Sequence, residues 1–240
     1  MAQQPQQENE GPKRAMVVIA HPDDAEFLCG GTIARWCAEG WEVIYVVTTN
    51  GDRGSHDIEV NPRTLAIVRQ DEQRRACEVL GVKDCIFLGY GDGFIEDTVE
   101  FRSRMVKEIR RFRPDVVLTW DAFRRGFNHR DHRITGQVAI DAVYPLARSP
   151  LYFEEHLLEG LRGHECNEVW LAGTDQPDHW VDVSDYFETK LDAILCHESQ
   201  IRQRSREQMA EMMRKRSAET GKDQNMALAE AFRRVTWGNR

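Results

Sequence analysis

The sequence predicts an α/β fold in which helices cover both faces of a mostly parallel sheet. Short apolar runs, several of them rich in β-branched residues, recur at residues 15–20, 42–48, 84–88 and 115–120. Each run is followed, after a polar loop, by a longer segment whose apolar residues recur at helical spacing. The chain has 240 residues, of which 41% are hydrophobic, so it is long enough to bury one sizeable core.

The first strand is predicted over residues 15–20, a continuous apolar run of the kind that forms a buried strand. A helix follows over residues 25–39 and ends at Gly40, because glycine is favoured just after a helix. The second strand, residues 42–48, is rich in β-branched side chains. Residues 50–62 are polar and contain glycine, so they are predicted to form a loop.

The next helix is predicted over residues 62–80 and leads into the third strand at 84–88. Another amphipathic helix covers residues 98–112. It stops there because the residue before Pro114 disfavours helical geometry. The fourth strand is predicted at residues 115–120.

Beyond this point the pattern becomes less regular. A helix is predicted over residues 131–148, and edge strands are predicted at 169–172 and 180–183. Residues 185–213 and 226–235 are predicted to be helical. The alternation of strands and helices in the first part of the chain implies right-handed β-α-β units.

Together these elements predict one Rossmann-like three-layer sandwich, a single domain over residues 14–240. Residues 1–13 are polar and lack the basic start and apolar stretch of a signal peptide, so we expect a disordered tail.

Charge and composition exclude several classes of function. The formal net charge is -8 and the pI about 5.5, so the chain has little to gain from displacing counterions on nucleic acid. No apolar run approaches the roughly 20 residues needed to span a bilayer. Six cysteines are present without a C-x-x-C pair, which predicts reduced thiols and a cytoplasmic protein.

Polar loops follow all four predicted strands. They cover residues 21–24, 50–53, 89–92 and 121–132. Because ligands of parallel sheets bind beyond the carboxyl ends of the strands, we expect these loops to form one site.

Two pairs of residues in these loops, each with at least one histidine, have the spacing of metal ligands. His21 and Asp24 are separated by three positions in a turn that Pro22 stiffens. His129 and His132 have the same spacing at a predicted helix start, so we expect them to share a face. A mixed nitrogen and oxygen set with an open position favours catalytic zinc. Spacing alone does not decide which of the second pair binds the metal.

Asp23 lies beside Asp24 and cannot easily point at the same ion. Zinc lowers the pKa of a water molecule to roughly 7, and a neighbouring carboxylate can accept its proton. The alternative interpretation is an acidic turn that caps the following helix.

These residues resemble the LmbE/PIG-L family of zinc N-deacetylases. The main motifs are Ala20-His-Pro-Asp-Asp24 and His129-x-Asp-His132, and weaker agreements are Thr49-Asn-Gly-Asp-Arg-Gly54, Arg69-Gln-Asp-Glu72, Leu80-Gly81 and Cys196-His-Glu-Ser-Gln200. The resemblance runs over about residues 15–200. It implies that His21, Asp24 and His132 bind Zn²⁺ and that Asp23 is the general base. It also implies that His129 stabilises the oxyanion or protonates the leaving amine.

The same resemblance implies substrate contacts for Arg69, Asp92 and Arg53. The implied reaction removes an acetyl group from an N-acetylated amino sugar and releases acetate. A zinc amidase acting on a larger sugar-thiol conjugate is an alternative with the same site.

A non-catalytic sugar- or nucleotide-binding protein is a third hypothesis. No G-x-G-x-x-G follows the first strand, and Gly30-Gly31 falls inside a predicted helix, which argues against it. Arginines are dense over residues 202–216. They indicate either a solvated helix face or, as the resemblance suggests, a subunit contact in a homo-oligomer such as a trimer or hexamer.

Overall fold

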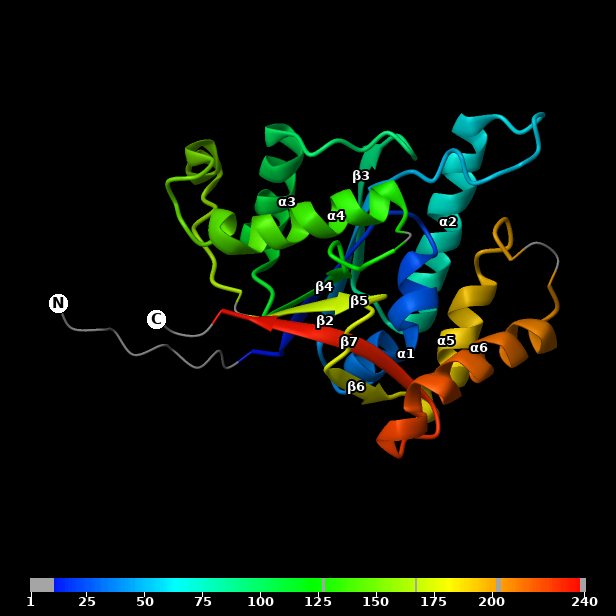
Figure 1. Cartoon of the computed structure of the whole chain (residues 1–240). Helices are drawn as coiled ribbons and strands as arrows, with labels where there is room; N and C mark the ends of the chain where they lie inside the picture. The colour runs from blue at the N-terminus through cyan, green and yellow to red at the C-terminus, as the bar shows by residue number, and fades with distance from the viewer. Residues whose placement is uncertain (1–10, 127, 167, 202–203, 238–240) are drawn as a thin grey trace.

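The computed structural model describes residues 11–126, 128–166, 168–201 and 204–237. Most of the predicted tail, residues 1–10, lies outside the described residues. The strands of the described chain are β1 Arg14–Ile19, β2 Glu42–Thr49, β3 Asp84–Tyr90, β4 Val116–Trp120, β5 Glu168–Ala172, β6 His179–Asp182 and β7 Ala229–Thr236. They form one sheet in the order β3-β2-β1-β4-β5-β7-β6 (Figure 1). The first five strands in this order run parallel, and β7 is antiparallel to both of its neighbours.

Helices cover both faces of the sheet (Figure 1). The main helices are α1 Asp24–Ala38, α2 Pro62–Leu80, α3 Val99–Phe112, α4 Arg130–Asp141, α5 Phe187–Leu195 and α6 Arg206–Gly221. Helices α1, α2, α5 and α6 pack on one face, and α3 and α4 pack on the other. The predicted fold class is therefore confirmed. Across the described residues, no helix is long and apolar enough to cross a membrane. That residues 14–240 form a single domain stays a prediction.

Strand β1 shows why the first strands of the chain are continuous apolar runs in the sequence. Its alternate residues Ala15, Val17 and Ile19 enter the core under α1 and α2, while Met16 and Val18 enter the core under α3 and α4. All five are fully buried. A strand with helices on both faces has no solvent side, so every position favours an apolar residue.

The predictions for the C-terminal third were partly wrong. Residues 226–235, predicted to be helical, belong largely to β7, which pairs with both β5 and β6. Residues 169–172 form β5, which lies inside the sheet rather than at its edge. The edge strand predicted at 180–183 is confirmed as β6, displaced by one residue.

Two predicted helices were too long. The helix predicted over 185–213 is two helices, because α5 ends at Leu195 and α6 begins at Arg206 after a capping box on Ser205. The helix predicted over 131–148 is regular only to Asp141. A π-helical turn, Ala142–Ala147, follows and contains a proline.

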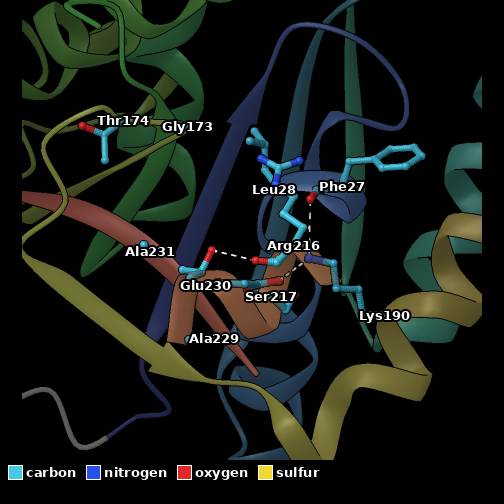
Figure 2. Close-up of a pocket in the computed structure, with 11 residues that line it drawn as sticks. Phe27, Leu28, Gly173, Thr174, Lys190, Arg216, Ser217, Ala229, Glu230 and Ala231 are labelled. Atoms are coloured by element: carbon cyan, nitrogen blue, oxygen red, sulfur yellow. Dashed lines mark hydrogen bonds and ion pairs between the residues drawn. The ribbon is translucent and has the colours of Figure 1, made fainter. Parts of the chain in front are cut away.

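Helix α1 breaks at Cys29, whose backbone is non-helical. The Glu230 carboxylate from β7 accepts hydrogen bonds from the backbone N–H groups of Gly31 and Thr32, just after the break. The Lys190 ammonium donates to the same carboxylate at 2.6 Å and to the Phe27 carbonyl at 3.4 Å (Figure 2). The two halves of α1 are therefore held separately, and the first half carries residues of the site.

Candidate active site

The loops that follow β1 to β4 meet at one edge of the sheet, as the sequence predicted. Three of the predicted metal ligands approach one another closely. The His132 Nε2 atom lies 3.2 Å from His21 Nδ1 and 3.3 Å from Asp24 Oδ1. Ligand atoms on a tetrahedral zinc ion, each 2.0–2.1 Å from the metal, lie about 3.3 Å apart. The three side chains are therefore close enough to share one metal ion. The structure also brings together two other groups that could hold one, His21 with His129 and His132, and His21 with Asp92 and Asp131.

The other oxygen of Asp24 is held by three N–H groups. Its Oδ2 atom accepts from the backbone of Ala20 at 3.1 Å and of His21 at 2.9 Å, and from Trp120 Nε1 at 3.1 Å. Burial opposes ionisation, but the nearby His132 and His21 rings hold the pKa of Asp24 well below its usual range. The Trp120 ring also stacks on His132, with ring centroids 3.7 Å apart. These contacts fix the orientation of Asp24 and His132, two of the proposed ligands.

His21 meets carboxylates on its other side. Its Nε2 atom lies 3.1 Å from Asp131 and 3.3 Å from Asp92. Burial alone would lower the pKa of His21, but the hydrogen bonds with Asp131, Asp24 and Asp92 raise it to about 12. The carboxylates of Asp24, Asp92 and Asp131 thus surround one imidazole, an arrangement that favours a cation in this pocket. A carboxylate behind a metal-binding histidine is the usual way to fix its ring and its tautomer.

His129 lies at the start of α4, directly before its first residue, and its ring lies near those of His21 and His132. It is the N-cap residue, and its Nδ1 atom accepts the Asp131 backbone N–H at 3.2 Å. Its ring centroid lies 5.0 Å from those of His21 and His132. Burial and these two rings lower the pKa of His129. Because Nδ1 accepts, the proton of the neutral ring is on Nε2, available for donation.

Asp23 has a left-handed backbone, with φ of 102°, unusual for a residue other than glycine. Its carboxylate makes no capping bond to α1, so the capping interpretation fails. Burial raises the pKa of Asp23 to about 6, although the Arg69 guanidinium, 3.3 Å away, acts in the opposite direction. Asp23 is therefore a half-buried carboxylate beside the predicted ligands.

Arg69, Asp92 and Arg53 were predicted to contact the substrate. Arg69 is buried and donates to the carbonyls of Pro22 and Gly51 at 2.5 and 3.0 Å, so it supports the turn that carries Asp23. Asp92 faces His21. The Arg53 side chain is 58% exposed and lies over the ring of Phe94, outside the cluster. Their substrate contacts stay predictions.

Sequence reasoning missed two residues that contact the predicted ligands, Asp131 and Trp120. Asp131 stands between the two histidines of the His129-x-Asp-His132 motif, and that position is the signal that could have identified it. Trp120 is the last residue of β4 and was assigned only to the strand.

The fold and this cluster define a hydrolase-like site at a sheet edge, and comparisons with known proteins agree. Residues 16–143 match the PIG-L family, described as GlcNAc-PI de-N-acetylase, so the chain belongs to the PIG-L (LmbE-like) family. It is 38% identical over 188 residues to a diacetylchitobiose deacetylase of Thermococcus kodakarensis, covering 78% of this chain and 70% of that protein.

A solved structure of N,N′-diacetylchitobiose deacetylase from Pyrococcus horikoshii, in complex with an inhibitor, is also similar. The TM-score is 0.88 at 32% identity, covering 93% of this chain and 84% of that one. A mycothiol S-conjugate amidase of Streptomyces coelicolor is 31% identical over 59% of this chain and 55% of its own length.

Proposed function

We propose that this protein is a zinc-dependent N-deacetylase that removes the acetyl group from an N-acetylated amino sugar. One observation carries the proposal. The His21, Asp24 and His132 ligand atoms converge at zinc-ligand spacing, 3.2–3.3 Å for the pairs that include His132, beside the separate Asp23 carboxylate and His129 ring. The names of the relatives, which include diacetylchitobiose deacetylases, support the sugar as substrate.

His21, Asp24 and His132 would hold the ion. When bound, a divalent metal polarises the amide carbonyl and lowers the pKa of a water molecule. Zinc is the proposed metal because two imidazoles and one carboxylate with an open position are a typical catalytic zinc set.

Asp23 accepts the proton of the attacking water as the general base. Arg69 lies 3.3 Å from the Asp23 carboxylate and favours its ionised form before the reaction. His129 donates from Nε2 to the developing oxyanion or to the leaving amine, since its Nδ1 is occupied by the Asp131 N–H. Preorganised donors of this kind are worth about 3–4 kcal/mol in the transition state.

The substrate contacts proposed are Arg69, Asp92 and Arg53. Asp92 and Arg53 follow the ends of β3 and β2, where a sugar ring next to the acetamide would lie. The amidase alternative has a specific basis in the similarity to mycothiol S-conjugate amidase, and it uses the same metal and base.

We further propose a cytoplasmic homo-oligomer, a trimer or hexamer. All six cysteines are free thiols, which fits a reducing compartment. Exposed apolar side chains, including Leu151 at 79% and Leu158 at 91%, offer surface for a subunit contact.

The test uses the purified protein with N-acetylglucosamine, N,N′-diacetylchitobiose and a sugar-thiol conjugate amide. Free amine and acetate are measured before and after chelation, together with zinc content. We expect about one zinc per chain, acetate release from an acetylated sugar, and loss of activity on chelation that added zinc restores. Full activity in metal-free protein would refute the mechanism, and cleavage of the conjugate alone would favour the amidase.

A further inference from the structure

A chain of buried polar groups lies beneath the turn that carries Asp23. The Asp23 backbone N–H donates to Gln73 Oε1 at 2.9 Å, and Gln73 Nε2 donates to Glu26 Oε1 at 2.9 Å. The other Glu26 oxygen lies 3.1 Å from His197 Nε2. Gln73, Glu26 and His197 are each 0% exposed. They come from α2, α1 and the turn after α5, and none of them has a part in the proposed reaction.

Glu26 fixes the direction of the hydrogen bonds in this network. A carboxylate can only accept, so Glu26 requires the amide nitrogen of Gln73 to face it. The amide oxygen must then face Asp23, which offers an N–H. Among the described residues, the His197 ring bonds only to Glu26, and its Nδ1 atom is buried without a partner. Burial lowers the pKa of His197, but the hydrogen bond with Glu26 outweighs this and raises it.

The conformation of Asp23 makes this contact important. Its left-handed φ of 102° is unfavourable for a side chain with a Cβ and needs support from its surroundings. Arg69 supports the turn through the Pro22 carbonyl, and Gln73 supports it through the Asp23 N–H. Both contacts hold the same peptide unit, one at each side. Rotation of that unit would redirect the Asp23 carboxylate.

We propose that Glu26, Gln73 and His197 are positioning residues that hold the Asp23 peptide, and through it the Asp23 carboxylate, in its working orientation. This inference rests on the proposed role of Asp23 as the base. It predicts that the network acts mainly on kcat, because none of its hydrogen bonds goes to a proposed metal ligand or substrate contact.

The experiment first removes the Gln73 oxygen that accepts from Asp23, and then restores an acceptor there by exchanging the amide and the carboxylate of Gln73 and Glu26. Gln73→Met keeps the length of the side chain but offers no acceptor to Asp23. The double variant Gln73→Glu with Glu26→Gln exchanges carboxylate and amide and preserves all three hydrogen bonds. Glu72→Gln is the matched control. It alters a buried carboxylate next to Gln73 on α2, which accepts from the Ser199 N–H at 2.7 Å and not from Asp23.

In Gln73→Met we expect kcat to fall about 10- to 100-fold, with KM within about threefold and zinc content unchanged. The double variant recovers kcat to within about threefold of wild type, and Glu72→Gln keeps wild-type kcat. Hydrogen exchange of the Asp23 amide gives a second readout. It is slow in wild type and in the double variant and fast in Gln73→Met.

A folded Gln73→Met protein with full kcat would overturn the proposal. So would a double variant whose Asp23 amide is protected but whose kcat stays low. If Gln73→Met does not fold, the double variant decides by the same two measurements. Failure of the proposed function is distinguishable, because the wild type would then release no acetate while the amide exchange would still report on the network.

Discussion

A single methyl group added to α4 tests how closely the site depends on helix placement. Gly136 lies in the middle of α4, against the end of β4. A Cβ atom at this position would meet the Trp120 carbonyl oxygen at 2.3 Å and the Ala122 Cβ at 3.3 Å. Ordinary carbon–oxygen contacts begin near 3.3 Å. In Gly136→Ala, α4 must therefore move by about 1 Å, because the obstacle is backbone and cannot rotate away.

Two opposing effects, helix propensity and overpacking, determine the expected stability of Gly136→Ala. Alanine in place of glycine inside a helix gains about 0.5–1 kcal/mol, whereas overpacking of this kind costs about 1–3 kcal/mol. We expect a net loss of about 1–2 kcal/mol and a Tm lower by about 2–8 °C. The first turn of α4 carries His132 and follows His129, so the shift also misplaces both rings. A displacement of about 1 Å can cost roughly 100-fold in rate.

The assay measures Tm, zinc affinity and kcat/KM for Gly136→Ala and for the control Arg133→Ala. Arg133 is exposed on the same helix, and its variant should stay within about 0.5 kcal/mol of wild type. A higher Tm in Gly136→Ala with unchanged zinc affinity and activity would refute the reasoning. That result would mean that helix propensity alone acts and that α4 does not lie against the end of β4.

Three further predictions follow from the site and its supports. His132→Ala should lose most of its zinc and its activity, whereas His129→Ala should keep zinc and lose turnover; metal analysis of both variants checks this, and the reverse result would exchange their roles. Asp23→Asn should keep the metal and the fold while kcat drops roughly 10²- to 10⁴-fold in steady-state assays, and near-native turnover would exclude it as the base. Lys190→Met should cost about 3–5 kcal/mol in urea unfolding, because Glu230 stays buried without its cation; a loss below about 1 kcal/mol would contradict that account.

The early part of the fold was predictable because its signals are local. Strands β1 to β4 are continuous apolar runs, and the helices after them show helical spacing and end at glycine or before proline. Because ligands bind beyond the carboxyl ends of parallel strands, the predicted strand ends also predicted which loops form the site. His21, Asp23 and Asp24 could be singled out from spacing and from the family resemblance, without any knowledge of long-range contacts.

The rest depended on partners far away in the sequence. Residues 226–235 read as a helix, but β5 and β6 offer them two strands to pair with, and pairing decides their structure. The break between α5 and α6 contains His197 and Ser199, whose bonds reach α1 and α2. The position of His129 as an N-cap depends on one hydrogen bond to Asp131 that spacing cannot reveal.

The place of β7 in the sheet has a consequence for how the chain is made. β7 is the last strand of the described chain to leave a ribosome, yet it lies between β5 and β6. Until residues 229–236 emerge, β5 presents an open edge to other nascent chains, and such an edge is a template for wrong pairing. The N–H groups of Gly31 and Thr32 also lack their acceptor until Glu230, about 200 residues later in the sequence, has been synthesised. Nascent chains that pause before residue 229 are therefore the species most exposed to aggregation and most dependent on chaperones.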